Sequence, residues 1–181
     1  MSDEIEKKYR LQAGQKDLLG AALTGLGAEY VGADFEENVL FLGHGLLERE
    51  AVLRLRRVGG ATVVTYKQKI ASDAGLKHHR EYETTVEDFD EMAKIFEALG
   101  FHRSMVYEKR RRTWRFRDVE IVLDELPFGD FMEIEGPVAG IAEAEALLGA
   151  ADYEGETKTY PLLTLDHGRR NGAVIEARFD E

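Results

Sequence analysis

Hydrophobic residues recur at helical spacing in three parts of the chain. One helix is predicted between Thr85, which can cap its N-terminus, and Gly100, which can end it. Its apolar stripe consists of Phe89, Met92, Ala93, Phe96 and Leu99. The same spacing predicts a second helix over 15–26 and a third that follows Pro137 and continues to Leu148. Each of these helices must pack its apolar face against another part of the fold.

Most of the remaining chain shows the two-residue alternation of β-strands. The segments with this pattern are 3–10, 51–58, 61–70, 78–84, 105–117, 119–124 and 130–136. Gly59-Gly60 is a two-residue hairpin signal between two of them, and Arg117-Asp118 can connect the next pair. Because strands outnumber helices, we expect an α+β fold that is rich in β-sheet.

One face of each predicted strand carries regularly spaced charges. Residues two apart on a strand point to the same side of the sheet. The residues that share these faces are Glu4, Glu6 and Lys8; Arg54 and Arg56; Lys67 and Lys69; Glu81 and Glu83; Lys109 and Arg111; Asp124; and Glu133 and Glu135. Paired carboxylates lie on the first and last strands and paired cations on middle ones, a segregation that solubility alone does not require.

Two arrangements of these strands fit the pattern. In the first, an ordinary antiparallel sheet turns its charged face to water and its apolar face to the helices. In the second, the strands close into a barrel, so that the apolar faces pack outward on the helices and the charged faces line a lumen. Charges in a lumen are too costly to bury without each other, metal ions or a charged ligand. Opposed carboxylates and cations would suit a metal-chelated polyphosphate.

Composition narrows the possible functions. The chain has 181 residues, which fits one domain, and we assign residues 1–166 to it and residues 167–181 to a turn-rich, peripheral tail. With 24 Lys and Arg against 35 Asp and Glu, the net charge of −11 argues against a nucleic-acid binder, since duplex affinity needs a basic face. No apolar run approaches the ~20 residues of a membrane span. The acidic N-terminus and the lack of cysteine favour a cytoplasmic location.

The N-terminal segment Glu4-Ile5-Glu6-Lys7-Lys8 resembles the ExExK signature of CYTH domains, the triphosphate tunnel metalloenzymes. Further segments that resemble the family follow in order at 53–56, 65–67, 80–83, 108–114, 123–125 and 131–136. The resemblance implies a closed eight-stranded antiparallel tunnel barrel with a charged lumen and with helices packed outside. It also implies that basic residues bind a triphosphate and that acidic residues bind one or two Mg²⁺ or Mn²⁺ ions.

The resemblance assigns roles to residues of the charged faces. The residues implied in catalysis are Glu4, Glu6, Lys8, Lys67, Lys109 and Arg111. Those implied in triphosphate binding are Lys8, Arg54, Arg56, Lys67, Lys109, Arg111 and Lys158. Those implied as metal ligands are Glu4, Glu6, Asp124, Glu133 and Glu135, and supporting roles fall to Glu81, Glu83 and Lys69. In the alternative interpretation, the carboxylates are only ion-pair partners of the cations.

Within the family, the run over 99–131 resembles the class IV adenylyl cyclases, which implies cyclisation of ATP to cyclic AMP and pyrophosphate. The alternative is a triphosphatase that hydrolyses inorganic tripolyphosphate, thiamine triphosphate or a nucleoside triphosphate. A non-catalytic polyphosphate or nucleotide sensor is a further alternative. The segment from Phe35 to Leu47 departs from the family pattern. We expect a small-molecule triphosphate as ligand, no nucleic-acid or membrane partner, and a monomer or homodimer.

Overall fold

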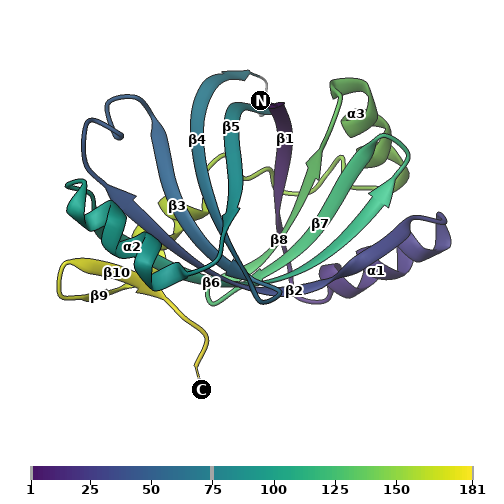
Figure 1. Ribbon diagram of the computed structural model, residues 1–181. Helices are drawn as coiled ribbons and strands as arrows, with labels where there is room; N and C mark the ends of the chain where they lie inside the picture. Colours follow the sequence, from purple (N-terminus) through teal and green to yellow (C-terminus); the bar gives the residue numbers. More distant parts are fainter. Residues whose placement is uncertain (1, 74–75, 181) are drawn as a thin grey trace.

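The computed structural model describes residues 2–73 and 76–180 (Figure 1). The side chains of residues 2–4, 71–73 and 76–78 are not described. Its elements, in chain order, are β1 (Ser2–Leu11), α1 (Gln15–Gly25), β2 (Glu29–Leu42), β3 (Ala51–Val58), β4 (Ala61–Asp73), β5 (Leu76–Val86), α2 (Phe89–Ala98), β6 (His102–Phe116), β7 (Val119–Leu126), β8 (Gly129–Glu135), α3 (Val138–Leu147), α4 (Tyr160–His167), β9 (Arg169–Asn171) and β10 (Val174–Ala177). Among the described residues, no helix combines the length and apolar character needed to cross a bilayer.

The described strands form one curled sheet. Their order is β2-β3-β4-β5-β1-β8-β7-β6-β10-β9, and β2 also pairs with β6. Strands β1 to β8 therefore form a continuous circuit of antiparallel pairs, in which the β2–β6 ladder joins the two ends of the row. Figure 1 shows the sheet curled into a half-barrel with α1, α2 and α3 outside it. The predicted β-rich α+β class is confirmed.

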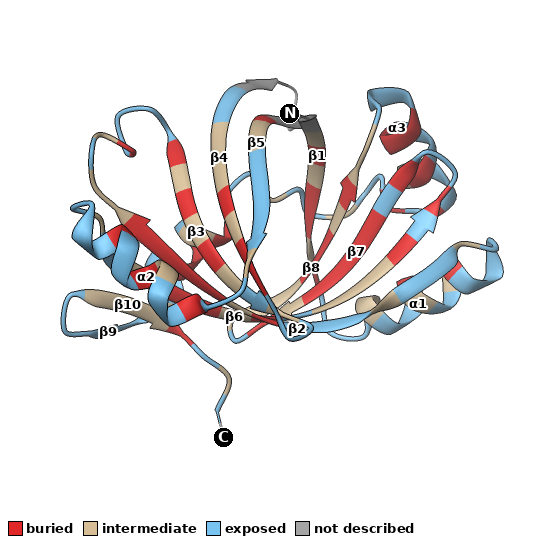
Figure 2. Cartoon of the chain, in the orientation of Figure 1, coloured by how far each residue is buried: buried red, intermediate tan, exposed pale blue. Residues whose placement is uncertain are grey.

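The helices α1, α2 and α3 pack on the outer face of the sheet, where most apolar strand positions point. Leu19 and Leu23 of α1 belong to one core cluster with Trp114 of β6. Phe96 of α2 belongs to a second cluster and contacts the ring of Phe41, with ring centroids 5.1 Å apart. Figure 2 shows the resulting alternation of buried and partly exposed positions along β3. The alternate, charged positions consequently lie on the inner face.

One predicted element boundary is wrong, and the alternation pattern missed strand β2. The helix α2 begins at Phe89 rather than near Thr85, because Asp88 is its N-cap and accepts a hydrogen bond of 2.9 Å from the Glu91 amide. The β-branched Thr85 instead pairs with Val63 of β4. Strand β2 was not predicted, because its first half is exposed on both faces and lacks the alternation of a half-buried strand.

A third cluster of buried apolar side chains lies on the inner face, next to the charged positions. Leu40, Met105 and Phe131 belong to it, and each lies an even number of residues from a charged inner position of its own strand. The helix α4 contributes Tyr160 and Leu163 to this cluster. The short helix α4, which the hydrophobic pattern did not predict, therefore packs against the interior of the curled sheet.

The C-terminal residues add to the sheet. Strand β10 runs parallel to β6, with Ile175 opposite Met105. Glu37 of β2 and Glu108 of β6 lie directly opposite each other, and like charges in that position repel. Arg178 lies between them, with its Nη1 atom 3.0 Å from Glu37 and 2.8 Å from Glu108. This guanidinium compensates the repulsion and fastens the chain end to the β2–β6 ladder.

Candidate functional site

The inner face of the sheet carries a set of charged side chains from the eight strands β1 to β8, which we call the charged cluster. Its members are Glu6, Lys8, Glu36, Arg54, Arg56, Lys67, Glu81, Glu83, Lys109, Arg111, Asp124 and Glu133. All but Glu36 were predicted as site residues from the sequence. Ion pairs of 4.0 Å or less connect each member to at least one other.

Arg111 is the best-connected cation of the charged cluster. Its Nε and Nη2 atoms donate to the two carboxylate oxygens of Asp124 over 2.7 and 2.6 Å, and Nη2 also donates to Glu133 over 2.8 Å. Arg111 and Asp124 are direct cross-strand partners on β6 and β7, so the register fixes this forked pair. Glu133 also forms an ion pair of 3.1 Å with Lys8, its cross-strand partner on β1.

The other half of the charged cluster lies on β3, β4 and β5. The Nη2 atom of Arg56 is 3.2 Å from Glu83, and the Nζ atom of Lys67 is 3.1 Å from Glu81. The side chain of Arg54 is 4.0 Å from Glu81 and 3.8 Å from Glu83. Lys67 also lies 4.0 Å from Glu6 of β1, so this half is continuous with the first.

Several of these charges are buried, which is costly unless every polar atom is satisfied. Asp124 is fully buried, and Lys8 and Lys109 are nearly so. Within the described residues, the Nε atoms of Arg54 and Arg56 are buried without a hydrogen-bond acceptor. An anion with several oxygens could accept hydrogen bonds from these two unsatisfied guanidinium N–H groups.

Burial lowers the pKa of Lys109, and the neighbouring Arg111 guanidinium lowers it further. The carboxylates of Asp124 and Glu36 act in the opposite direction. An additional anion beside Lys109 would favour its charged form, so anion binding and protonation of Lys109 should support each other.

Glu36 is the member of the charged cluster that the sequence did not reveal. It is 2% exposed, and its carboxylate lies 3.3 Å from Lys109, 3.6 Å from Arg56 and 3.9 Å from Arg111. Burial alone would raise the pKa of Glu36, but these cations outweigh burial and hold the pKa well below its usual range. The sequence carries no alternation that marks Glu36, because Glu37 follows it directly and Val39 to Leu42 is a continuous apolar run.

This lowered pKa predicts an acid-dependent loss of stability. A carboxyl group whose folded-state pKa is lowered stabilises the fold above its ordinary pKa of 4.5, and this contribution is lost as the pH falls further. Between about pH 6 and pH 3.5, the wild-type protein should lose about 1.4 kcal/mol more free energy of unfolding than Glu36→Gln. Urea denaturation at the two pH values measures the difference. Equal losses in both proteins would contradict the assigned ionisation.

Tyr160 of α4 also contacts the charged cluster and was not foreseen. Its hydroxyl donates to Asp124 over 2.7 Å, and the Nζ atom of Lys8 lies 3.7 Å from the centre of its ring. Burial and the Asp124 carboxylate raise the pKa of Tyr160 well above its ordinary value, so the phenol remains a donor. Tyr160 thereby orients an anion and a cation of the cluster from a helix rather than from a strand.

The structure does not bring every predicted side chain to the charged cluster. The Nζ atom of Lys158 is 2.5 Å from Asp166 on α4, although the backbone oxygen of Lys158 accepts a hydrogen bond of 3.3 Å from Lys8. Lys69 is exposed and lies 3.3 Å from Glu50. The backbone of Glu4 pairs with His79 on β5, but its side chain lies outside the described part of the structure.

The predicted metal ligands fit a hard divalent cation by their chemistry. Glu6 and Glu135 are direct cross-strand partners on β1 and β8, and Glu133 shares the strand face of Glu135. Facing carboxylates repel unless a cation lies between them. Their oxygen donors are the type that Mg²⁺ and Mn²⁺ prefer. Among the described side chains, however, no three acidic or imidazole groups are gathered closely enough to hold an ion by themselves.

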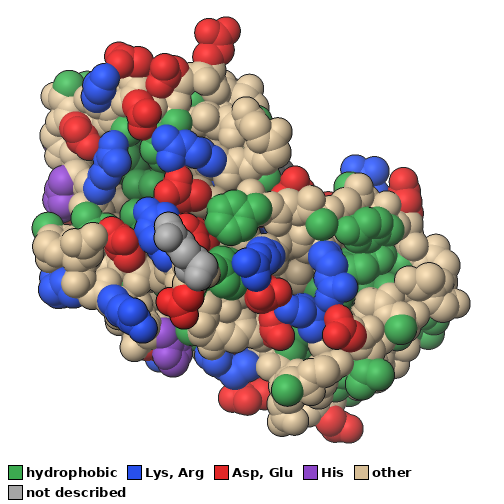
Figure 3. Space-filling model, turned by 90° about the horizontal axis from the view of Figure 1, so that it is seen from below, with side chains coloured by type: hydrophobic (Ala, Val, Ile, Leu, Met, Phe, Trp, Pro, Cys, Tyr) green, Lys and Arg blue, Asp and Glu red, His purple; other side chains and the backbone are tan. Residues whose placement is uncertain are grey.

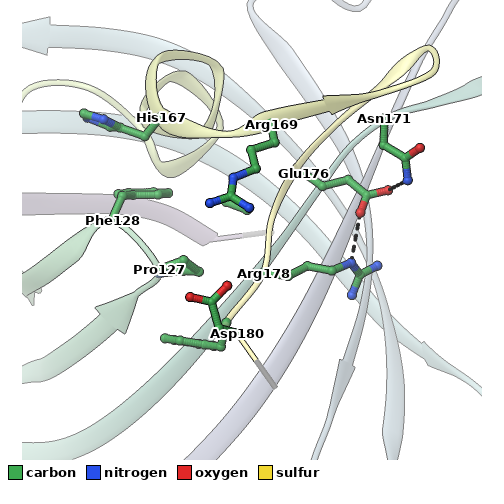
Figure 4. Close-up of a pocket in the computed structure, with 10 residues that line it drawn as sticks. Pro127, Phe128, His167, Arg169, Asn171, Glu176, Arg178 and Asp180 are labelled. Atoms are coloured by element: carbon green, nitrogen blue, oxygen red, sulfur yellow. Dashed lines mark hydrogen bonds and ion pairs between the residues drawn. The ribbon is translucent and has the colours of Figure 1, made fainter.

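A separate cavity of about 370 Å³ lies beside the C-terminal hairpin and contains none of the predicted site residues. Figure 4 shows the stacked rings of Phe128 and His167 on one side of it and Arg169 pointing into it. On the molecular face seen in Figure 3, basic and acidic side chains lie beside one another rather than in one basic patch. The charged cluster is therefore the candidate site.

The site therefore consists of buried, paired carboxylates and cations enclosed by a curled antiparallel sheet. The CYTH domain family matches residues 2–158, and the chain belongs to this family. The family resemblance predicted from the sequence is confirmed.

Comparisons with individual proteins agree with this assignment. A Methanocaldococcus jannaschii protein named as a putative adenylate cyclase is 30% identical over 148 residues, which are 80% of this chain and 83% of that protein. A protein structure from Pyrococcus horikoshii superposes on this chain with a TM-score of 0.77 and 28% sequence identity. The match covers 88% of this chain and 98% of that protein. A Hippeastrum protein described as a putative adenylyl cyclase with a dominant triphosphatase activity shares the fold, with a TM-score of 0.70, 20% identity and coverage of 90% and 95%.

Proposed function

We propose that this protein is a divalent-metal-dependent enzyme that acts on a triphosphate bound at the charged cluster. The observation that carries the proposal is the set of buried cations with two unsatisfied guanidinium N–H groups, on Arg54 and Arg56, on the same inner face as the facing carboxylates Glu6 and Glu135. Cations alone would suit any anion, whereas the added carboxylates suit an anion that arrives with a metal ion. Members of the CYTH family include proteins with adenylate cyclase names and with triphosphatase activity.

The reaction we favour is cyclisation of ATP to cyclic AMP and pyrophosphate, as the name of the Methanocaldococcus jannaschii relative suggests. The ribose 3′ oxygen would attack the α-phosphorus, and pyrophosphate would leave. The proposed phosphate-binding residues are Lys8, Arg54, Arg56, Lys67, Lys109 and Arg111, with Lys158 joining them if its side chain leaves Asp166. These cations would stabilise the negative charge that develops on the leaving pyrophosphate.

The proposed metal ligands are drawn from Glu4, Glu6, Asp124, Glu133 and Glu135. A bound Mg²⁺ or Mn²⁺ ion would supply further neutralisation of the phosphate oxygens. Asp124 differs from the other carboxylates, because both of its oxygens already accept hydrogen bonds from Arg111 and one of them also accepts Tyr160. Within this proposal, Glu81, Glu83 and Lys69 keep supporting roles, the first two by holding Arg54, Arg56 and Lys67 in place.

The second candidate function is hydrolysis of a triphosphate. It is favoured by the Hippeastrum protein of the same fold, for which a dominant triphosphatase activity is described. The same cations and carboxylates would serve either reaction, and only the nucleophile would differ, being water in place of the ribose 3′ hydroxyl. A non-catalytic sensor is less well supported, because a pure anion binder has no need of Glu6 and Glu135.

Product analysis separates these functions. The purified protein is incubated with ATP, tripolyphosphate or thiamine triphosphate in the presence of Mg²⁺ or Mn²⁺, and the products are identified by phosphorus NMR. Cyclic AMP with pyrophosphate indicates cyclisation, and orthophosphate release indicates hydrolysis. We expect turnover to be abolished by EDTA and restored by either metal, because the candidate ligands are carboxylates. Full turnover in EDTA would contradict the proposed metal dependence.

We further propose that the functional unit is residues 1–166, with residues 167–181 as an appended tail, and that the protein acts in the cytoplasm as a monomer or homodimer. The family match over residues 2–158 supports the division of the chain. The lack of cysteine supports the cytoplasmic location. Size-exclusion chromatography with light scattering would determine the oligomeric state.

A further inference from the structure

The Glu36 carboxylate lies among cations of the charged cluster. Three of the cations proposed to bind the triphosphate surround its carboxylate, namely Lys109 at 3.3 Å, Arg56 at 3.6 Å and Arg111 at 3.9 Å. A carboxylate presents two oxygens to these cations, as a phosphate group does. Any phosphate bound by the same cations must therefore lie close to a negative charge that belongs to the protein.

The side chain of Glu36 is held in this position by its surroundings. Glu36 lies on β2 directly between its cross-strand partners Val58 on β3 and Lys109 on β6. The fully buried side chain of Asn38 donates to the Glu36 carboxylate over 3.3 Å. Strand pairing on both sides and a buried hydrogen bond leave the carboxylate little freedom to withdraw when an anion binds.

We propose that Glu36 is a specificity-determining residue, a built-in anion that competes with phosphate for Arg56, Lys109 and Arg111. This inference rests on the proposed function, since it assumes that a phosphate chain binds at the charged cluster. Repulsion between like charges grows with the charge of the ligand. Glu36 therefore weakens the binding of inorganic tripolyphosphate more than that of ATP, in which an ester replaces one charged terminal oxygen of the phosphate chain.

Each cation keeps another carboxylate when Glu36 is neutralised, so a folded variant is expected. Lys109 retains Asp124 at 3.6 Å, Arg56 retains Glu83 at 3.2 Å, and Arg111 retains Asp124. In Glu36→Gln the amide has the shape of the carboxylate without its charge. The matched control is Glu37→Gln, because Glu37 is the next residue on β2 but pairs with Arg57 and Arg178 outside the charged cluster.

The test measures the dissociation constants of ATP and tripolyphosphate by calorimetry, with and without Mg²⁺. Glu36→Gln should bind tripolyphosphate at least about tenfold more tightly than wild type, with a smaller gain for ATP, whereas Glu37→Gln should match wild type. Unchanged or weaker tripolyphosphate binding by a folded Glu36→Gln would overturn the inference.

Two further outcomes are decisive. If Glu36→Gln does not fold, Glu36→Asp replaces it in the test, because the shorter side chain moves the charge away from Lys109. Tighter tripolyphosphate binding by Glu36→Asp supports the inference, and unchanged binding overturns it. If neither wild type nor variant binds ATP or tripolyphosphate at millimolar concentration, the proposed function fails and this inference fails with it. If wild type binds these ligands and Glu36→Gln binds them equally well, the inference is overturned but the proposed function is not.

Discussion

Replacing Arg111 by alanine is expected to lower the free energy of unfolding by about 3 kcal/mol or more. Arg111 donates to both oxygens of Asp124, which is fully buried, and to Glu133. Without the guanidinium, these two carboxylates lie close together in the interior, and too little positive charge remains to compensate their repulsion and burial. Urea denaturation at pH 7, followed by circular dichroism, measures the loss.

The control for this prediction is Arg110→Ala. Arg110 is the adjacent residue of β6, but it points to the outer face, is largely exposed and pairs with Glu125. Exposed ion pairs contribute about 0–1 kcal/mol, so the control should remain close to wild type. If the two variants lose the same amount of stability, the charged cluster is not the electrostatic centre of the fold.

Replacing Glu135 by glutamine is expected to reduce metal-dependent turnover and metal affinity by about a hundredfold or more. The proposed role of Glu135 is that of a metal ligand opposite Glu6 on the neighbouring strand. Glutamine keeps the shape of the side chain but removes the charge that attracts the ion. In the absence of metal, the variant should be as stable as wild type or more stable, because one of two facing carboxylates has been neutralised.

A metal titration of turnover and thermal melts with and without Mn²⁺ test this prediction. Wild type should be stabilised by Mn²⁺ through linkage, and Glu135→Gln much less. Asp130→Asn is the control, because Asp130 lies on the same strand but pairs with Lys16 at 2.6 Å. Equal stabilisation of wild type and Glu135→Gln by Mn²⁺, with unchanged turnover, would exclude Glu135 from the metal site.

The alternation of charges along the strands was sufficient to predict which side chains share the inner face. Trp114 lies an odd number of residues from Lys109 and Arg111, and in the structure it packs in the outer core with Leu23 of α1, whereas the two cations lie in the charged cluster. Alternation works here because the side-chain period of a strand is two whatever the neighbouring strand is. The pattern therefore predicts faces well, and it predicted the charged cluster except for Glu36.

The sequence did not predict contacts that depend on how distant segments meet. Glu36 lies on a strand with an exposed first half, so its role becomes visible only when β2 pairs with Lys109 on β6. Tyr160 belongs to a short helix whose sequence signals are the Thr159 cap and the following Pro161. Lys158 precedes that helix in a loop, and no periodicity fixes the direction of a loop side chain, so its pairing with Asp166 could not be foreseen.

The ladder between β2 and β6 has a kinetic consequence. It joins strands that are far apart in the chain, so forming it costs more loop-closure entropy than forming the hairpin of β3 and β4. Glu36 lies on one strand of this ladder and Lys109 on the other, and their ion pair cannot form before the ladder does. We therefore expect the charged interior to dehydrate late in folding. Substitutions there should accelerate unfolding and leave the folding rate nearly unchanged, so these charges govern the lifetime of the native state.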